Sequence, residues 1–302
     1  MKVLITGGCG RIGSQLVKKL LKGGDQITVI DVHHGGIEGV NYIIAPIGEV
    51  SELGKVDIVY HLAASIDYKA SREELQKRNV EPTAHLLKLC KGCKQFIFMS
   101  TTSVYNESPE PLTEQTPPEP YTNYGWSKLV CEQVIKKSGV SYTILRSSQV
   151  YGPAFEEGFS SVLRHLQQGD MKVFGHGNNY IPLLHIDDLL DALVLVRRNP
   201  RALNQIFNVD GGYGKTQSEF MDIASNVLGV EPPKGRVKPA IAKLFGQLTG
   251  KGPAVVEYID KLTKDRLMSI DKIRAIGFEP KVGLEDGIRG VVAAFRESGI
   301  LQ

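Results

Sequence analysis

The sequence predicts an α/β fold in which a doubly wound parallel sheet is joined to a smaller, mostly helical C-terminal lobe. Short apolar strands alternate with amphipathic helices through the first half of the chain, which is the pattern of repeated βαβ units. A glycine-rich loop separates the first expected strand from the first expected helix. After Pro153 the alternation gives way to helices joined by stretches rich in Gly and Pro, such as Glu231–Gly235.

Hydrophobic periodicity defines the elements of the first half. Arg11–Lys22 carries its apolar residues on one side of a helix. Ser71–Lys91 begins at an N-cap residue, with Glu74 three positions on as in a capping box. The expected strands are Lys2–Thr6, Gln26–Ile30, Val40–Ala45, Asp57–Tyr60, Gln95–Met99 and Ser141–Leu145, and the remaining helix is Tyr121–Lys137. These elements predict a parallel sheet with helices on both faces.

The second half is predicted to divide between two domains. The strand Gln205–Val209 is expected to return to the sheet. The expected helices are Phe159–Gln168, Asp187–Arg198, Thr216–Leu228, Val255–Leu262 and Leu284–Ser298. We therefore expect one domain from residues 1–152, with 183–210 returning to it, and a substrate-binding lobe from 153–182 and 211–302.

Composition and charge exclude several classes of protein. The 302 residues are 42% hydrophobic and 23% charged, which is an ordinary globular balance. A net charge of +3 does not indicate binding to nucleic acid or to a membrane surface, and no apolar run approaches the roughly 20 residues of a membrane span. The N-terminus is expected to be a strand, not a signal peptide. Four cysteines predict no disulfide scaffold and favour a cytoplasmic location. No metal-ligand spacing is present.

The glycine loop predicts a dinucleotide site. Gly7, Gly10 and Gly13 are three residues apart, directly after a strand, and Arg11 and Ile12 open the following helix. Glycine permits a tight turn and a close approach of the backbone to a pyrophosphate, which the helix N-terminus also attracts. The fold is therefore expected to be of Rossmann type.

The second strand predicts which dinucleotide is bound. Asp31 ends this strand, where a carboxylate accepts hydrogen bonds from ribose hydroxyls. Val32 and two histidines follow it, with no Arg or Lys to receive a 2′-phosphate. NAD is therefore favoured over NADP.

Tyr124 and Lys128 form a candidate catalytic pair. A spacing of four places the phenol and the ammonium on one face of a helix. A nearby ammonium favours the phenolate and makes the tyrosine a usable base. The run Ser100–Ser103 follows the strand Gln95–Met99, at the carboxyl edge of the sheet where ligands bind. Taken alone, the pair is more typical of a solvated helix surface, and the hydroxyl run is typical of simple strand-end capping.

Together these motifs resemble the extended short-chain dehydrogenase/reductase family, in its NAD-dependent sugar-nucleotide epimerase/dehydratase branch. The resemblance extends along nearly the whole chain. It is carried by Thr6–Gly13, Asp31, His61–Ala64, Asn79–Val80, the Ser/Thr run ending in Val104–Tyr105, Tyr124–Lys128, Arg146, Val150–Pro153, Leu184–Asp188 and Ile276–Pro280.

The resemblance implies roles for individual residues. Tyr124 is the general base, Lys128 positions the nicotinamide ribose and lowers the tyrosine pKa, and Thr101 is the hydroxyl partner. Asn79 supports the active-site geometry beside the cofactor. Leu62, Ala63 and Ala64 form a strand end that passes under the cofactor. The resemblance also implies a homodimer that is formed by the helices Ser71–Lys91 and Tyr121–Lys137.

Several positions depart from the family pattern. Thr102 and Ser103 carry no carboxylate where dehydratases and decarboxylases place an acid, which disfavours those reactions. Ile181 and Pro182 stand where an Arg-Asp pair often holds the nucleotide diphosphate. The other departures are Gln149 in place of the usual Asn and Pro46 in place of an Asp that bonds adenine.

These departures bear on the substrate contacts more than on the catalytic residues. Thr102, Gln149 and Arg266 are the candidate substrate contacts. Arg266 is the candidate for the diphosphate, and a solvated surface charge is the alternative interpretation of this residue.

Two reactions and one non-catalytic role fit these residues. The first is an NAD-dependent epimerase, most like a UDP-sugar 4-epimerase. The alternative is an NAD(P)-dependent dehydrogenase or reductase of a non-nucleotide alcohol that resembles a steroid or flavonol. A nucleotide-sensing protein on the same fold is disfavoured, because a sensor needs neither Tyr124 nor Lys128.

Overall fold

The computed structural model describes residues 1–156, 159–241, 259 and 263–302. Within these residues, seven strands form one parallel sheet. In spatial order the strands are β3 (Val40–Ile44), β2 (Gln26–Asp31), β1 (Lys2–Thr6), β4 (Ile58–His61), β5 (Gln95–Thr101), β6 (Tyr142–Ser147) and β10 (Gln205–Val209). The predicted doubly wound sheet is confirmed.

The direction of strand order reverses next to β1. The chain runs from β1 outward through β2 to β3, and then returns to place β4 on the other side of β1. Val3 is therefore paired with Ile27 on one side and with Ile58 on the other. At such a switch point the connections leave the two strands in opposite directions, which opens a crevice at their carboxyl ends.

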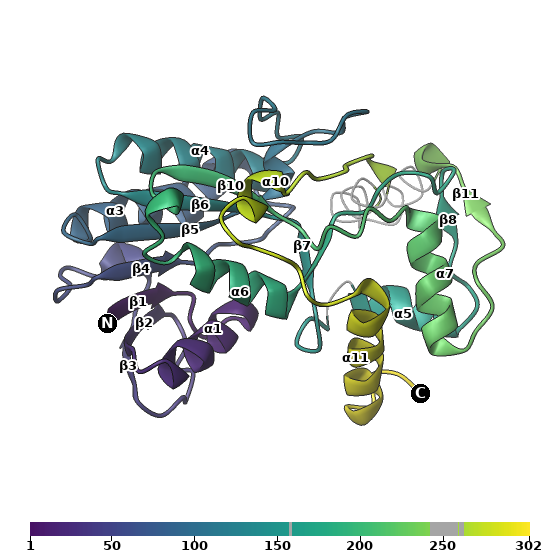
Figure 1. The fold of residues 1–302 in the computed structure, drawn as a ribbon, viewed down its shortest axis with the longest axis horizontal. Helices are drawn as coiled ribbons and strands as arrows, with labels where there is room; N and C mark the ends of the chain where they lie inside the picture. Colours follow the sequence, from purple (N-terminus) through teal and green to yellow (C-terminus); the bar gives the residue numbers. More distant parts are fainter. Residues whose placement is uncertain (157–158, 242–258, 260–262) are drawn as a thin grey trace.

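Helices cover both faces of the sheet (Figure 1). Helices α1 (Arg11–Lys22) and α6 (Ile186–Val196) lie on one face, and α3 (Glu81–Leu89) and α4 (Asn123–Lys137) lie on the other. Leu16 and Leu193 belong to the apolar core of the first face, whereas Leu86 and Ile135 belong to that of the second. Because both faces are covered, the central strands β1, β4 and β5 are buried almost throughout.

The second part of the molecule is built mainly from helices and lies to the right in Figure 1. It contains α5 (Phe159–Gln167), α7 (Gln217–Leu228) and α11 (Leu284–Glu297), with the strand pair β8 (Val173–Phe174) and β11 (Arg236–Val237). Phe159, Phe220 and Phe295 lie in its apolar core. The strand pair β7 (Gln149–Tyr151) and β9 (Leu183–His185) and the short helix α10 (Asp271–Arg274) complete the described elements used below.

The expected helix Ser71–Lys91 is interrupted. It begins at Ser71 with the expected capping box, in which Ser71 Oγ accepts from Glu74 N and Glu74 accepts from Ser71 N. Helix α2 (Arg72–Leu75) is then followed by one π-helical turn (Gln76–Val80) before α3 begins. Such turns occur frequently at functional sites, and this one contains the candidate residue Asn79.

Two further helix starts differ from the prediction. Helix α4 begins at Asn123, because the side chain of Thr122 caps it by accepting from Gly125 N. Helix α6 begins at Ile186, and its cap is the His185 side chain rather than the Asp187 carboxylate. The expected helix Val255–Leu262 lies outside the described residues except for Ile259.

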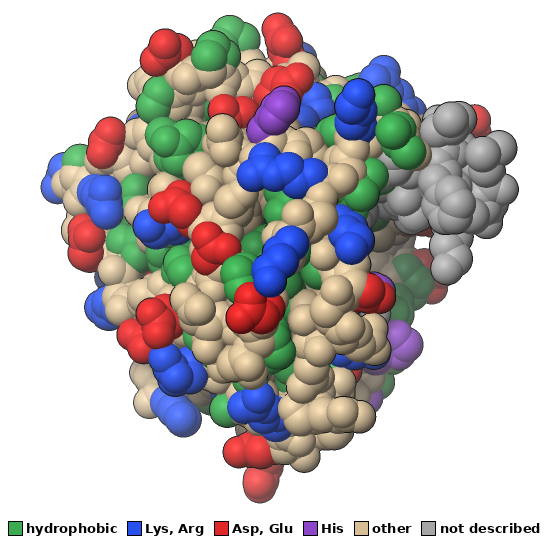
Figure 2. All heavy atoms as spheres, turned by 90° about the vertical axis from the view of Figure 1, so that its right-hand side faces the viewer, with side chains coloured by type: hydrophobic (Ala, Val, Ile, Leu, Met, Phe, Trp, Pro, Cys, Tyr) green, Lys and Arg blue, Asp and Glu red, His purple; other side chains and the backbone are tan. Residues whose placement is uncertain are grey.

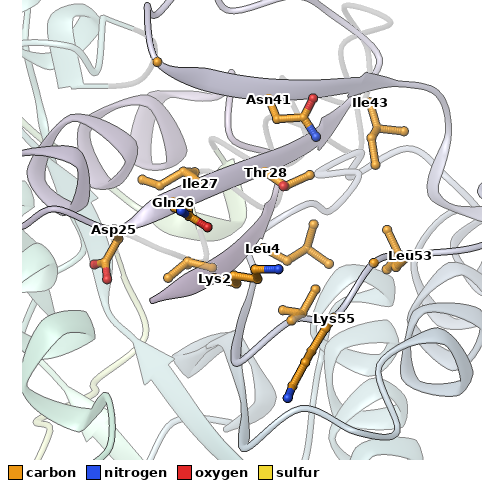
Figure 3. Close-up of a pocket in the computed structure, with 14 residues that line it drawn as sticks. Lys2, Leu4, Asp25, Gln26, Ile27, Thr28, Asn41, Ile43, Leu53 and Lys55 are labelled. Carbon is orange, nitrogen blue, oxygen red and sulfur yellow. The ribbon is translucent and has the colours of Figure 1, made fainter.

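A groove of about 450 Å³ lies on the sheet at β1, β2 and β3 (Figure 3). Residues 32–39, all of which the structure describes, connect β2 to β3 without a helix, although parallel strands are usually joined through one. Residues 53–56 border the groove instead, together with Lys2, Thr28 and Asn41. The groove lies toward the amino ends of β1 and β2, so it is separate from the crevice at their carboxyl ends.

The face of the C-terminal part carries both signs of charge. Lys and Arg side chains are interspersed with Asp and Glu on this face (Figure 2), in keeping with the small net charge of +3. Among the described residues, no helix combines the length and the apolar character that are needed to cross a bilayer.

Candidate active site

The glycine loop between β1 and α1 leaves the backbone bare at the crevice. Gly7 has φ +69°, and a Cβ there would lie 2.8 Å from Ala63 N. A Cβ on Gly13 would lie 2.1 Å from Gly7 O, so only glycine lets α1 approach the loop this closely. No side chain among the described residues caps the α1 N-terminus at Gly10. Its first N–H groups therefore fit the phosphates of a dinucleotide.

Asp31 stands at the end of β2 beside this loop. Its Oδ2 accepts from Cys9 N at 3.0 Å, and its Oδ1 accepts from His33 N at 3.2 Å. These two bonds fix the carboxylate next to the glycine turn. The neighbouring Val32 is 57% exposed, and Arg11, the first residue of α1, is exposed as well.

The residues that follow β4 are held by Asn79. Asn79 is 4% exposed, and its Oδ1 accepts from Ser65 N at 2.7 Å while its Nδ2 donates to Ser65 O. The same Nδ2 donates to Ser127 Oγ on α4 at 3.0 Å. The Asn79 side chain thus braces the segment after Leu62, Ala63 and Ala64 against the helix that carries Tyr124, in agreement with a supporting role.

Tyr124 and Lys128 lie one turn apart on α4 in different surroundings. Tyr124 is half-buried and meets the ring of Tyr68 edge to face, with ring centroids 6.0 Å apart. Lys128 is only 2% exposed, and its Nζ lies 4.0 Å from the centroid of the Phe98 ring. Burial lowers the pKa of Lys128 to about 8. The interpretation of this pair as a solvated surface is therefore wrong for Lys128.

The hydroxyl run at the end of β5 meets the first turn of α4. Thr101 Oγ1 donates to Ser103 Oγ at 3.2 Å and accepts from Ser103 N. A Cβ on Gly125 would lie 2.1 Å from Ser103 O, so α4 packs directly on this turn. The candidate hydroxyl partner Thr101 and the candidate base Tyr124 therefore flank one contact between β5 and α4. Thr102, in contrast, is buried, with 4% exposure.

A buried ionic network supports α4, the helix that carries Tyr124 and Lys128. This network was not predicted from the sequence. Arg146 on β6 donates through Nε and Nη2 to the two carboxylate oxygens of Glu132, and through Nη1 to Tyr105 Oη. Ser100 Oγ also donates to Glu132 at 2.6 Å. Glu132 lies four residues after Lys128, on the same face of α4. The position of Glu132 on the inner face of the expected helix was the feature of the sequence that could have indicated this network.

Arg266 is buried, which excludes a solvated surface charge. Its side chain is 3% exposed, and its Nε has no hydrogen-bond partner among the described residues. The guanidinium lies 5.8 Å from the centroid of the Tyr121 ring, and Lys264 Nζ lies 4.4 Å from the same centroid. Two cations therefore converge on an aromatic ring three residues before Tyr124. Lys264 was not among the candidates.

Two further departures from the family pattern, Gln149 and Ile181, lie near the β7–β9 strand pair. Gln149 opens β7 and is exposed, so its amide is available to a ligand. Ile181 packs against the apolar core of the C-terminal part, which accounts for an apolar residue where a diphosphate-binding arginine was expected. Gln149 and Arg266 therefore remain candidate substrate contacts, whereas Ile181 has a packing role.

Comparison with known proteins agrees with this geometry. The family model described as "NAD dependent epimerase/dehydratase family" matches residues 3–210. The chain is 27% identical to the UDP-glucose 4-epimerase of Vibrio cholerae, over 98% of this chain and 96% of the relative. It is 28% identical to a putative UDP-glucose 4-epimerase of Methanocaldococcus jannaschii, over 96% of this chain and 97% of the relative.

Solved structures share the fold over its whole length. A UDP-glucose 4-epimerase of Thermotoga maritima, solved with UDP-glucose, has a TM-score of 0.80 and 26% identity, and 99% of each chain is covered. A UDP-glucuronic acid 4-epimerase of Bacillus cereus, solved with NAD, has a TM-score of 0.82 and 23% identity, again with 99% of each chain covered. With the glycine loop, Asp31 and the Tyr124–Lys128 pair in place, this chain belongs to the NAD-dependent epimerase/dehydratase family, and NAD is its cofactor.

Proposed function

We propose that this protein is a UDP-sugar 4-epimerase that uses bound NAD. The observation that carries the proposal is the contact between the β5 end and α4, which combines Thr101 with the Tyr124–Lys128 pair and places no carboxylate at Thr102 or Ser103. These groups suffice to oxidise and reduce a sugar at C4. A dehydratase needs a further acid to move a second proton. The full-length similarity to UDP-glucose 4-epimerases supports the same reaction.

In the proposed mechanism Tyr124 removes the proton of the C4 hydroxyl, and Thr101 holds the same oxygen. When bound, NAD⁺ would supply the acceptor for the C4 hydride, and its reduced form would be the hydride source for reduction at the opposite face of the sugar. The Lys128 ammonium holds the nicotinamide ribose and favours the phenolate of Tyr124. The 4-keto sugar turns in the site between the two transfers, and Tyr124 then gives its proton back to the oxygen at C4.

Arg266 is proposed to bind the nucleotide diphosphate. A buried guanidinium whose Nε has no partner among the described residues favours an anion with paired oxygens. Lys264 adds a second positive charge beside the same Tyr121 ring, although Asn106 and Glu107 already contact it. Thr102 and Gln149 are the other proposed substrate contacts. In this arrangement residues 1–152 with 183–210 hold NAD, and residues 153–182 with 211–302 hold the sugar nucleotide.

The deciding experiment is incubation of the protein with UDP-glucose or UDP-galactose, followed by chromatography of the sugar nucleotides. An epimerase interconverts the two sugars while absorbance at 340 nm stays flat, because the hydride returns within one binding event. A dehydrogenase of non-nucleotide alcohols instead forms NADH steadily from an alcohol. Steady NADH formation without sugar interconversion would contradict the proposal.

We also propose that the protein works as a homodimer in the cytoplasm. All four cysteines lie in described residues and are free thiols, which suits a reducing compartment. The dimer is proposed to form through the helices α3 and α4, which cover the face of the sheet away from α1 and α6 (Figure 1).

A further inference from the structure

A chain of buried hydrogen bonds passes through His61 beneath the proposed NAD site. On one side, Ala63 N donates to Thr6 Oγ1 at 3.3 Å, and Thr6 Oγ1 lies 2.7 Å from His61 Nδ1. On the other side, His61 Nε2 lies 2.8 Å from Thr83 Oγ1, and Thr83 Oγ1 donates to Asn79 O at 2.7 Å. The path therefore joins the end of β1, the segment after β4, and the π-helical turn.

The single proton on each hydroxyl fixes the direction of every bond in this chain. The carbonyl Asn79 O only accepts, so Thr83 uses its proton there and must accept from His61 Nε2–H. A neutral imidazole then has a bare Nδ1, which accepts the proton of Thr6 Oγ1. Thr6 is left to accept from Ala63 N–H, as the geometry requires. The opposite tautomer would leave a bare Nε2 facing Thr83 Oγ1, whose proton is already donated to Asn79 O.

The surroundings of His61 keep its imidazole neutral. The side chain is 2% exposed, and its ring lies 5.7 Å from the Phe96 ring and 5.5 Å from the Phe98 ring. Burial, together with the nearby Lys128 ammonium, lowers the pKa of His61 to about 3. A cationic ring would also donate to Thr6 Oγ1, which already accepts from Ala63 N, and would leave the Thr6 proton without Nδ1 as its acceptor. Both geometry and charge therefore favour one uncharged form.

The same path continues to the catalytic helix. Asn79 Nδ2 donates to Ser127 Oγ at 3.0 Å, and Ser127 Oγ donates to Tyr124 O at 2.8 Å. His61 therefore stands midway between the peptide of Ala63 and the backbone of Tyr124. The ring thus adds a second link between these two segments, beside the direct bonds from Asn79 to Ser65.

We propose that His61 is a positioning residue whose neutral Nε2–H tautomer fixes the segment under the cofactor relative to the catalytic helix. The proposal rests on the NAD site of the proposed function, but not on the identity of the sugar. His61 touches neither reactant; it acts through Thr6 and Ala63 on one side and through Thr83 and Asn79 on the other. Its loss is expected to loosen dinucleotide binding and slow turnover, while the KM for the sugar substrate changes little.

The tautomer is tested on the unaltered protein by nitrogen NMR of histidine-labelled, full-length chain without cofactor. The signal of His61 is identified by its disappearance in the His61→Asn variant. We expect a neutral ring with the proton on Nε2 at pH 7, and no protonation down to pH 5. An Nδ1–H form, or a cationic ring at pH 7, would overturn the proposal. This readout uses no sugar, so it remains decisive if the epimerase assay fails.

The coupling is tested by NADH fluorescence titration of two variants and their combination. His61→Gln keeps a donor near Thr83 but removes the acceptor for Thr6, and Thr6→Val removes the other partner of that bond. Each substitution is expected to lower the affinity for NADH about tenfold, as for the loss of one buried hydrogen bond. Because both remove the same bond, the double variant is expected to be no weaker than either single one.

A buried hydroxyl elsewhere provides the matched control. Thr143 Oγ1 donates to Ala202 O at 2.7 Å and accepts from Gln95 Nε2, far along β6 from the crevice. Thr143→Val is expected to lower the melting temperature but to leave NADH affinity unchanged. If Thr143→Val weakens NADH as much as Thr6→Val does, or if the effects of Thr6→Val and His61→Gln simply add, His61 has no positioning role.

Discussion

At the scale of single residues, Tyr124 tests whether the proposed chemistry is correct. Tyr124→Phe removes only the hydroxyl, so the ring still packs edge to face with Tyr68 and the helix is unchanged. We expect NADH binding to persist while turnover falls about 10²–10⁴-fold, because general-base transfer is lost. Steady-state assays and fluorescence titration measure the two effects. Tyr142→Phe at the amino end of β6 is the control, and equal losses in both variants would exclude Tyr124 as the base.

We expect Lys128 to support turnover while lowering the free energy of unfolding. Its pKa falls from about 10.5 to about 8, which corresponds to about 3 kcal/mol of unfavourable free energy at pH 7. Lys128→Met should therefore raise the free energy of unfolding by an amount of that order, while NADH affinity and turnover drop. Urea denaturation at pH 7 measures the first effect, with the exposed Lys136→Met as the control.

The same shift sets the pH dependence of stability. Between pH 8 and pH 10.5 the unfolded chain holds a proton on Lys128 that the folded protein has released. The free energy of unfolding of the unaltered protein should therefore rise with pH across this window, relative to Lys128→Met, and the full cost is present below pH 8. A constant difference between the two proteins from pH 7 to pH 10.5 would contradict this expectation.

Asp31 is expected to select NAD over NADP. A carboxylate fixed by Cys9 N and His33 N accepts from ribose hydroxyls, but it repels a 2′-phosphate. Calorimetric titration should give a Kd for NADH at least about tenfold lower than that for NADPH. Asp31→Asn keeps an acceptor and removes the charge, so the preference should narrow. Equal affinities in the unaltered protein would exclude this role.

At the scale of elements, Gly125 and Gly290 are both helical glycines, but we expect substitution by alanine to have opposite effects at the two positions. A Cβ on Gly125 would lie 2.1 Å from Ser103 O, whereas the space around Gly290 in α11 is open. Gly125→Ala should therefore push α4 from the β5 end and lower both stability and activity. Gly290→Ala should stabilise α11 by about 0.5–1 kcal/mol with activity unchanged. Thermal melts and turnover of the two variants measure this contrast.

Local patterns were predictable from the sequence where the chemistry depends on neighbours along the chain. The glycine loop, the capping box at Ser71 and the spacing of Tyr124 and Lys128 each lie within a few residues. The π-helical turn at Gln76–Val80 was not predictable, because one wide turn barely alters the apolar spacing of a long helix. Asn79 was identified only by resemblance, and its contacts with Ser65 and Ser127 required the fold.

At the scale of the whole molecule, α4 presents a half-buried apolar stripe. Trp126, Val130 and Val134 recur every four residues, and Arg72 lies 5.2 Å from the centroid of the Trp126 ring. Val130 and Val134 also pack against the apolar core of this face, and Leu129 packs inward against Val104 and its neighbours. The outer side of the stripe is the part of α4 that we propose for contact with a second copy of the chain.

Sedimentation at micromolar concentration tests the proposed dimer. The unaltered protein is expected to sediment at twice the mass of its 33.2 kDa chain. Val134→Asp places a charge in the stripe and should produce a monomer. Ile44→Asp, at an exposed position on the edge strand β3, should remain dimeric. A monomeric unaltered protein would exclude the dimer.

Long-range contacts limit what the sequence could predict of the whole. The seven strands of the sheet were expected, because parallel strands buried on both faces are continuous apolar runs. The position of Arg266 was not, because its burial depends on segments more than a hundred residues apart in the chain, as its approach to Tyr121 illustrates. The bond from Arg146 to Tyr105 also required the fold, because it joins β6 to the turn after the neighbouring strand β5.

The buried guanidinium of Arg266 gives the ligand-free protein an electrostatic cost. Its Nε has lost its hydration without gaining an acceptor among the described residues, which is an unfavourable state for a charged group. A ligand with diphosphate oxygens removes this cost on binding, whereas a neutral alcohol would leave it in place. Selectivity is then a matter of rejection as well as attraction. If Arg266 binds the diphosphate as proposed, uncharged compounds would be disfavoured independently of any contact with the sugar ring.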